Sequence, residues 1–130
     1  LLKFLSRIAP NFGVRNGLDP NGLSHDPDVV RAYQQDPLVH DRITPRLARF
    51  IATGGARVMR HAARWKVPTL LLYAGSDVLV DPQGSREFAA AAPPRYVQAH
   101  CYEDLYHEIF NELDAEPVYE TLRQWLDANF

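Results

Sequence analysis

The chain has 130 residues, of which 46% are hydrophobic and 23% are charged, and its formal net charge is −2. This balance is typical of a globular domain, and no apolar run reaches the roughly 18 residues that a membrane span requires. The 14 basic residues are scattered among 16 acidic ones, so no nucleic-acid partner is expected, because phosphate binding needs clustered positive charge. The single cysteine, Cys101, excludes an internal disulfide framework and fits a reducing compartment such as the cytoplasm.

The sequence begins with Leu rather than Met, inside an apolar pattern at helical spacing that includes Leu1, Leu2, Leu5 and Ile8. The charged region and the small-residue cleavage site of a secretory signal are both missing from these residues. We therefore expect the true amino terminus to lie upstream of Leu1.

Residues 1–66 are predicted to form helices joined by polar turns. Asp26 or Asp28 can cap a short helix that runs to about Gln34. A second helix is indicated by an apolar stripe at Ile43, Leu47, Phe50 and Ile51. Gly54-Gly55 is expected to loosen this helix before Val58, Met59, Ala62 and Ala63 resume its apolar face. No strand pattern is found in this half.

Residues 67–130 have a different pattern. The apolar run 69–74, introduced by Pro68, is typical of a strand that is buried on both faces. An Ala-rich helix is predicted over 85–92, and alternating residues predict a second strand beginning at Val97. A final amphipathic helix is indicated by Val118, Leu122, Trp125 and Leu126. The order strand, helix, strand, helix predicts a parallel pair in an α/β fold, and two strands suggest the end of a larger sheet.

Two ionisable residues follow the carboxyl ends of the predicted strands, where active groups gather in open α/β sheets. Asp77 lies three residues after the first strand, and His107 lies about five residues after the second. Such a pair can act as the acid and base of a nucleophilic triad. An Asp in a Gly-Ser-Asp turn can also be a simple turn former, and a lone His in a loop can be a solvated residue.

The segment 68–82, Pro-Thr-Leu-Leu-Leu-Tyr-Ala-Gly-Ser-Asp-Val-Leu-Val-Asp-Pro, resembles the acid-bearing strand and loop of α/β-hydrolases. The segment 106–112, Tyr-His-Glu-Ile-Phe-Asn-Glu, is similar to their histidine loop. Two further segments narrow the resemblance to the monoacylglycerol lipase and lysophospholipase branch of this superfamily. They are Gly84-Ser85-Arg86, and Asp36-Pro37-Leu38-Val39-His40 followed by Ile43 and Leu47. The resemblance covers nearly the whole chain.

This resemblance implies a partial α/β-hydrolase fold, with a helical cap over residues 1–66 and the carboxyl-terminal part of the core over residues 67–130. It implies that Asp77 is the acid and His107 the base of a triad in the order Ser, acid, His. The substrates would be carboxylic esters of acyl lipids, such as monoacylglycerols, cleaved through an acyl-enzyme without cofactor or metal. The cap would line an acyl pocket and would allow transient contact with a membrane surface.

The nucleophile motif of this family, Gly-X-Ser-X-Gly, is missing from the sequence. Gly22-Leu23-Ser24-His25-Asp26 begins correctly but ends in Asp, and the other serines are Ser6, Ser76 and Ser85. We therefore expect the missing amino-terminal half of the fold to supply the serine, and we expect this chain to be inactive alone.

Several other residues are weaker candidates. Asp81 is an alternative acid, although Asp77 directly follows the strand. Glu112 could hold the histidine loop in place or could be solvated. Phe50, Ile51 and Met59 could contact an acyl chain, or they could belong to the core. Cys101 lies on the apolar side of its strand, which favours inert packing, and the histidines lack the spacing of a metal site.

Two alternatives to a hydrolase half remain open. The chain could be a non-catalytic remnant of the fold that binds lipid or protein through the cap. It could also be a structural half that completes its sheet by pairing with another chain.

Overall fold

The structure is a computed structural model that describes residues 2–130. Its first part contains α1 (Leu2–Ile8), β1 (Val14–Arg15), α2 (Pro27–Gln35), β2 (Arg42–Ile43) and α3 (Pro45–Met59). The 3₁₀ turn η1 (Pro20–Gly22) lies between β1 and α2, and the 3₁₀ turn η2 (Ala62–Arg64) lies between α3 and the second part. Helices dominate this part, as predicted.

The prediction that the first half holds no strand is wrong. β1 and β2 form a short antiparallel pair in which Val14 faces Ile43 and Arg15 faces Arg42. Each strand has only two residues, which is too short to display the alternating pattern from which strands are recognised. The paired residues are distant in sequence, so no local pattern predicts the pairing.

Side-chain caps define where the two longer helices of this part begin. The carboxylate of Asp26 accepts a hydrogen bond from Asp28 N at 2.8 Å, which decides between the two predicted caps in favour of Asp26. The hydroxyl of Thr44 accepts from Leu47 N at 3.2 Å at the start of α3. α3 continues unbroken through Gly54 and Gly55, contrary to expectation. Its contacts with α1 and α4 offset the weak helix propensity of glycine.

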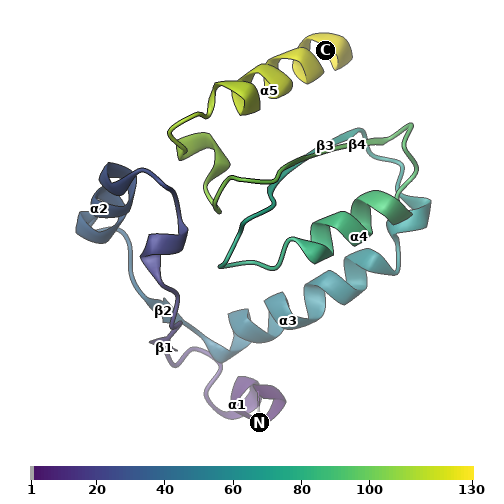
Figure 1. Ribbon diagram of the computed structural model, residues 1–130. Coiled ribbons are helices and arrows are strands. Elements are labelled where there is room, and N and C mark those ends of the chain that lie inside the picture. The colour runs from purple at the N-terminus through teal and green to yellow at the C-terminus, as the bar shows by residue number, and fades with distance from the viewer. Residues whose placement is uncertain (1) are drawn as a thin grey trace.

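The second part contains β3 (Thr69–Ala74), α4 (Gln83–Ala91), β4 (Val97–Tyr102), the 3₁₀ turn η3 (Ile109–Asn111) and α5 (Glu116–Asn129). β3 and β4 are parallel, and their register runs from Thr69 opposite Val97 to Ala74 opposite Tyr102. Figure 1 shows that α4 and α5 lie on opposite sides of this pair and that α3 runs alongside α4. The predicted order of strand, helix, strand, helix is confirmed.

A small core lies between the sheet and α5. Ala74, Ile109 and Val118 are buried there, and Val118 is fully inaccessible to solvent. They are surrounded by Leu72, Tyr102, Leu105 and Phe110. The expectation that the first strand is buried on both faces is met only at Ala74, because the rest of β3 is half-buried. Within residues 2–130, β3 pairs only with β4, so its other edge has no neighbouring strand there.

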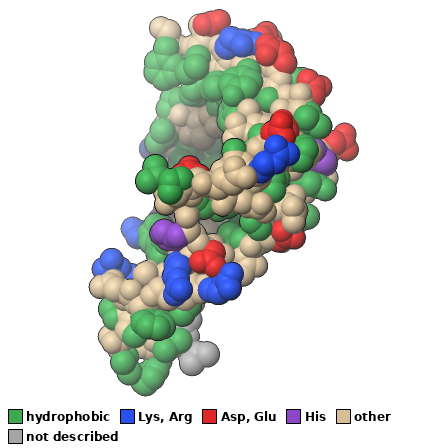
Figure 2. Space-filling model, turned by 90° about the vertical axis from the view of Figure 1, so that its left-hand side faces the viewer, with side chains coloured by type: hydrophobic (Ala, Val, Ile, Leu, Met, Phe, Trp, Pro, Cys, Tyr) green, Lys and Arg blue, Asp and Glu red, His purple; other side chains and the backbone are tan. Residues whose placement is uncertain are grey.

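Large apolar side chains are exposed on α1 and α3. Phe4, Ile8, Phe50 and Ile51 are all more than half exposed. Figure 2 shows that hydrophobic side chains gather at the end of the molecule that carries α1, and again beside a hollow in the opposite half. Among the residues that the structure describes, no helix is long and apolar enough to cross a membrane.

Candidate active site

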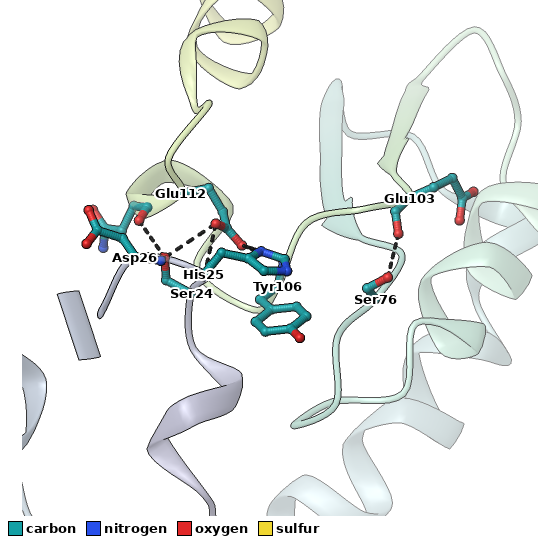
Figure 3. A network of polar contacts seen from close by, with 8 residues as sticks. Ser24, His25, Asp26, Ser76, Glu103, Tyr106 and Glu112 are labelled. Carbon is teal, nitrogen blue, oxygen red and sulfur yellow. Dashed lines mark hydrogen bonds and ion pairs between the residues drawn. The ribbon is translucent and has the colours of Figure 1, made fainter. Parts of the chain in front are cut away.

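The loops that follow β3 and β4 touch each other directly. Gly75 N donates to Tyr102 O at 2.8 Å, and the hydroxyl of Ser76 donates to Glu103 O at 2.8 Å (Figure 3). A Cβ atom at Gly75 would lie 2.5 Å from Cα of Glu103, so this close approach of two backbones requires glycine. The parallel register therefore brings the two loops together at the carboxyl ends of the strands.

The two predicted site residues meet across these loops. The Nδ1 atom of His107 lies 2.8 Å from Oδ2 of Asp77. The other oxygen of Asp77 accepts hydrogen bonds from Leu79 N at 2.8 Å and from Val80 N at 2.9 Å. The carboxylate is thus held from its own loop while it binds the imidazole.

The exposure of the two side chains differs in a way that suits an acid-base pair. The side chain of Asp77 is 10% exposed, whereas that of His107 is 38% exposed. Burial alone would raise the pKa of Asp77, but the hydrogen bonds from His107, Val80 and Leu79 outweigh burial and lower it. Asp77 is therefore an anion at neutral pH.

The hydrogen bond to Asp77 indicates which ring nitrogen of His107 carries the proton. The anionic carboxylate can only accept, so a neutral imidazole donates from Nδ1 and keeps a lone pair on Nε2. Nε2 can then take a proton from a nucleophile, and Asp77 stabilises the imidazolium that forms. The pair has the geometry of a general base and its orienting acid.

Asp77 and His107 lie at the wall of a cavity of about 430 Å³. Its other walls include Leu72, Val80, Ile109 and Phe110. A separate cavity of about 210 Å³ lies among Leu18, Leu23, Tyr33, Val39 and Leu79 and does not include the pair. The cavity at the pair joins apolar walls to a basic nitrogen, which suits an apolar substrate with one reacting polar group.

Comparison with known proteins identifies the family. The family model described as "Serine aminopeptidase, S33", of the Hydrolase_4 type, matches residues 1–114. The crystal structure of the monoacylglycerol lipase from Paleococcus ferrophilus superposes with a TM-score of 0.90 at 36% identity, covering 96% of this chain and 49% of that one. The chain belongs to the α/β-hydrolases. Its sequence and fold are similar to those of monoacylglycerol lipases within this family.

Two curated relatives and a second structure extend this likeness. The chain is 34% identical to a monoacylglycerol lipase of Mycolicibacterium smegmatis over 95% of its length and 44% of the relative. It is 32% identical to phospholipase YtpA of Bacillus subtilis over 96% of its length and 49% of the relative. A soluble variant of the Saccharomyces cerevisiae monoglyceride lipase, in complex with a substrate analogue, shares the fold with a TM-score of 0.83 at 23% identity, covering 99% of this chain and 48% of that one. The chain thus spans about half the length of these relatives.

Two of the serines in this α/β-hydrolase chain have hydroxyls that serve structural contacts. Ser24, in the segment that begins like the nucleophile motif, is buried, and its Oγ donates to Asn111 O at 2.9 Å. The same Oγ accepts from Asp26 N at 2.9 Å. The hydroxyl of Ser76 donates a hydrogen bond to Glu103 O, and Ser85 lies near the start of α4. Neither bonded hydroxyl is presented to His107.

The other predicted candidates lie in different places. The carboxylate of Asp81 accepts from Gln83 N at 2.9 Å at the start of α4, while His107 is bonded to Asp77. Phe50 and Ile51 project from α3 and are exposed, and Met59 is half-buried near the end of the same helix. None of these three lines the cavity at the Asp77–His107 pair, so their contact with substrate stays a prediction.

Cys101 occupies a mixed environment rather than an apolar one. It is half-buried on β4, and its Sγ lies 3.6 Å from a guanidinium nitrogen of Arg86. Burial raises the pKa of the thiol, with a further contribution from Glu103. A raised pKa reduces the thiolate fraction, so this cysteine is a poor nucleophile. Among the residues described, no group of three or more His, Cys, Asp or Glu side chains is arranged to hold a metal ion.

Glu112 is the residue whose role the sequence left open, and the structure places it in a buried network. Its side chain is 1% exposed and accepts from Tyr106 N at 2.7 Å and from His25 N at 3.1 Å. The interpretation that Glu112 holds the histidine loop is therefore correct. The partner His25 was missed, because 87 positions separate it from Glu112 and no local pattern links them.

Proposed function

We propose that this chain is the acid- and histidine-bearing part of a serine hydrolase that cleaves carboxylic esters of acyl lipids. The observation that carries the proposal is the 2.8 Å contact between Asp77 and His107 at the carboxyl ends of adjacent parallel strands. The activities of two similar proteins, a monoacylglycerol lipase and a phospholipase, support the proposed substrate class.

In the proposed reaction, His107 acts as general base and then as general acid. Its Nε2 takes the proton of a serine hydroxyl as that oxygen attacks the ester carbonyl, and it returns the proton to the departing alcohol. Water then attacks the acyl-enzyme, with His107 again accepting a proton and returning it to the serine as the fatty acid leaves. Asp77 stays ionised throughout and holds the imidazole in the required tautomer.

The nucleophile is proposed to come from outside the 130 residues. The buried Oγ of Ser24 and the bonded Oγ of Ser76 are unsuited to attack. The relatives are about twice as long as the matched segment, which leaves room for a Gly-X-Ser-X-Gly strand and turn elsewhere. On this proposal the chain alone does not turn over esters.

Residues 1–66 are proposed to form the cap and residues 67–130 the carboxyl-terminal core. Exposed apolar side chains on α1 and α3, including Phe4, Phe50 and Ile51, are suited to contact an acyl chain or a lipid surface. Asp77 and His107 both lie in the second segment, so on this proposal the cap supplies neither member of the pair.

The proposal is tested by fatty-acid release from a long-chain monoacylglycerol by the full-length protein that carries this chain. His107→Ala is expected to abolish measurable turnover without unfolding the protein, because it removes the only base of the pair. His100→Ala, at an exposed histidine on β4, serves as the matched control and is expected to keep wild-type activity. Equal activity of the wild type and His107→Ala would reject the proposal, and saturable binding of the lipid without turnover would favour a non-catalytic binding protein.

A further inference from the structure

Glu112 carries a buried carboxylate that the proposed chemistry does not use. Oε1 accepts from Tyr106 N at 2.7 Å and lies 2.9 Å from Nδ1 of His25, whereas Oε2 accepts from His25 N at 3.1 Å and from the Ser24 hydroxyl at 3.4 Å. Figure 3 shows the carboxylate between the segment that carries Ser24 and His25 and the loop that carries Tyr106. One side chain thus joins two segments that are far apart in sequence.

Backbone hydrogen bonds join the same two segments at the catalytic histidine itself. His107 N donates to Gly22 O at 3.4 Å, and Glu108 N donates to Leu23 O at 2.8 Å. Farther along the loop, the hydroxyl of Ser24 donates to Asn111 O. The histidine loop is therefore fastened to residues 22–25 both at His107 and beyond it.

Residues 22–25 also contact the loop of the acid. A Cβ atom at Gly22 would lie 2.5 Å from Cγ2 of Val78 and 3.2 Å from Cδ2 of Leu79. Leu79 N is one of the two backbone donors to the Asp77 carboxylate. A single short segment thus touches both loops of the pair.

The side chains of His25 and Tyr106 reinforce this connection. Their rings are stacked, with centroids 3.7 Å apart and an interplanar angle of 25°. Tyr106 directly precedes His107. The hydrogen bond from Tyr106 N to Glu112 and the stacking of the Tyr106 ring on His25 together restrain the residue before the base. The side chain of His25 is itself 41% exposed, so it can be changed without opening the core.

We propose that Glu112 and His25 are positioning residues of the hydrolase, which hold the histidine loop against residues 22–25 so that Nδ1 of His107 stays on Asp77. The expected effect on turnover rests on the proposed function. The effect on the Asp77–His107 hydrogen bond does not depend on it. Neither residue touches the reacting atoms. They act through the backbone of Tyr106 and His107.

The test uses the full-length protein and two readouts, turnover and the low-field proton NMR resonance of the His107 Nδ1–H, which is assigned by its loss in His107→Ala. Glu112→Gln keeps the shape of the side chain but replaces one acceptor oxygen with a donor. His25→Phe keeps the stack on Tyr106 and removes only the Nδ1 hydrogen bond. We expect kcat to fall by about tenfold or more with KM unchanged, because small misplacements of a catalytic group are costly. The resonance is expected to broaden or move upfield in both variants.

His100→Phe is the matched control for the histidine change and is expected to leave both readouts unchanged. If Glu112→Gln fails to fold, His25→Phe decides the question, because the Glu112 carboxylate still accepts from Tyr106 N and from the backbone nitrogen at position 25. A folded His25→Phe variant with wild-type kcat and an unaltered resonance would overturn the proposal. If the wild-type protein shows the resonance but no turnover, the proposed function fails. The positioning role is then still tested by whether the resonance changes in the two variants.

Discussion

Nδ1 of His107 lies 2.8 Å from Oδ2 of Asp77, although the two residues are 30 positions apart in the chain. The parallel register of β3 and β4 and the close approach of Gly75 to Glu103 produce this meeting. Under the proposed function, this contact joins the acid and the base of a serine hydrolase.

Separate replacement of Asp77 and Asp81 shows which of these two carboxylates is the acid. Asp77→Asn places an amide donor toward Nδ1, which favours the wrong imidazole tautomer, so kcat of the full-length protein is expected to fall by about 10³- to 10⁴-fold. Asp81→Asn is the matched control, because the Asp81 carboxylate accepts from Gln83 N, whereas His107 is hydrogen-bonded to Asp77. Steady-state ester hydrolysis measures both. A larger loss in Asp81→Asn than in Asp77→Asn would reverse the assignment of the acid.

Glu112 is expected to make stability depend on pH on the acid side. Burial would raise its pKa, but hydrogen bonds from Tyr106 N and from His25 outweigh burial and lower it. A carboxylate with a lowered folded-state pKa contributes stability that is fully present above its unfolded pKa and is lost as pH falls through the folded value. Urea unfolding should therefore show Glu112→Gln less stable by about 1–3 kcal/mol at pH 7, because buried donors lose their acceptor.

The difference between the wild type and Glu112→Gln should shrink as pH falls below about 4, where an ordinary glutamate becomes protonated. Asp114→Asn, at an exposed position, controls for the loss of one negative charge. A stability difference that stays constant from pH 7 to pH 3 would contradict the role of the ionised carboxylate.

Two glycine substitutions should change the free energy of unfolding in opposite directions. Gly75→Ala places a methyl group 2.5 Å from the backbone of Glu103, so we expect a loss of about 3 kcal/mol in unfolding free energy. Gly55→Ala lies within α3 and meets nothing within 4 Å, so we expect a gain of about 1 kcal/mol from helix propensity. Thermal or urea unfolding of the full-length protein checks the pair. A tolerated Gly75→Ala would mean that the two loops are farther apart than described.

Truncation of Val118 tests the small core beneath the pair. Its side chain is fully buried between α5 and the sheet, so Val118→Ala should cost about 2 kcal/mol through lost burial and a residual cavity. Leu38 is 88% exposed, and Leu38→Ala should change stability by less than about 0.5 kcal/mol. Similar effects of the two changes in urea unfolding would contradict the described packing.

The features that could be predicted from the sequence are those with local causes. The bounds of β3 follow from the apolar run after Pro68, and the start of α2 follows from Asp26 before Pro27. Asp77 and His107 could be placed together because parallel strands bring their carboxyl ends to one edge. These signals lie within a few residues of the features that they predict.

The features that were missed depend on contacts between distant segments. Two-residue strands such as β1 carry no periodic signal, and only their pairing defines them. The continuity of α3 through Gly54 and Gly55 depends on packing against α1 and α4. The His25–Glu112 contact depends on how residues 22–25 meet the histidine loop, which no spacing encodes.

The central claim, that Asp77 and His107 activate a serine nucleophile, is tested most directly by covalent labelling with a fluorophosphonate probe. The full-length protein should be labelled at one serine, in a Gly-X-Ser-X-Gly segment outside residues 1–130, as located by mass spectrometry. His107→Ala should slow this labelling by about 10³-fold or more, because the serine loses its base. No labelling of the wild type, or equal labelling rates in the wild type and His107→Ala, would contradict the account.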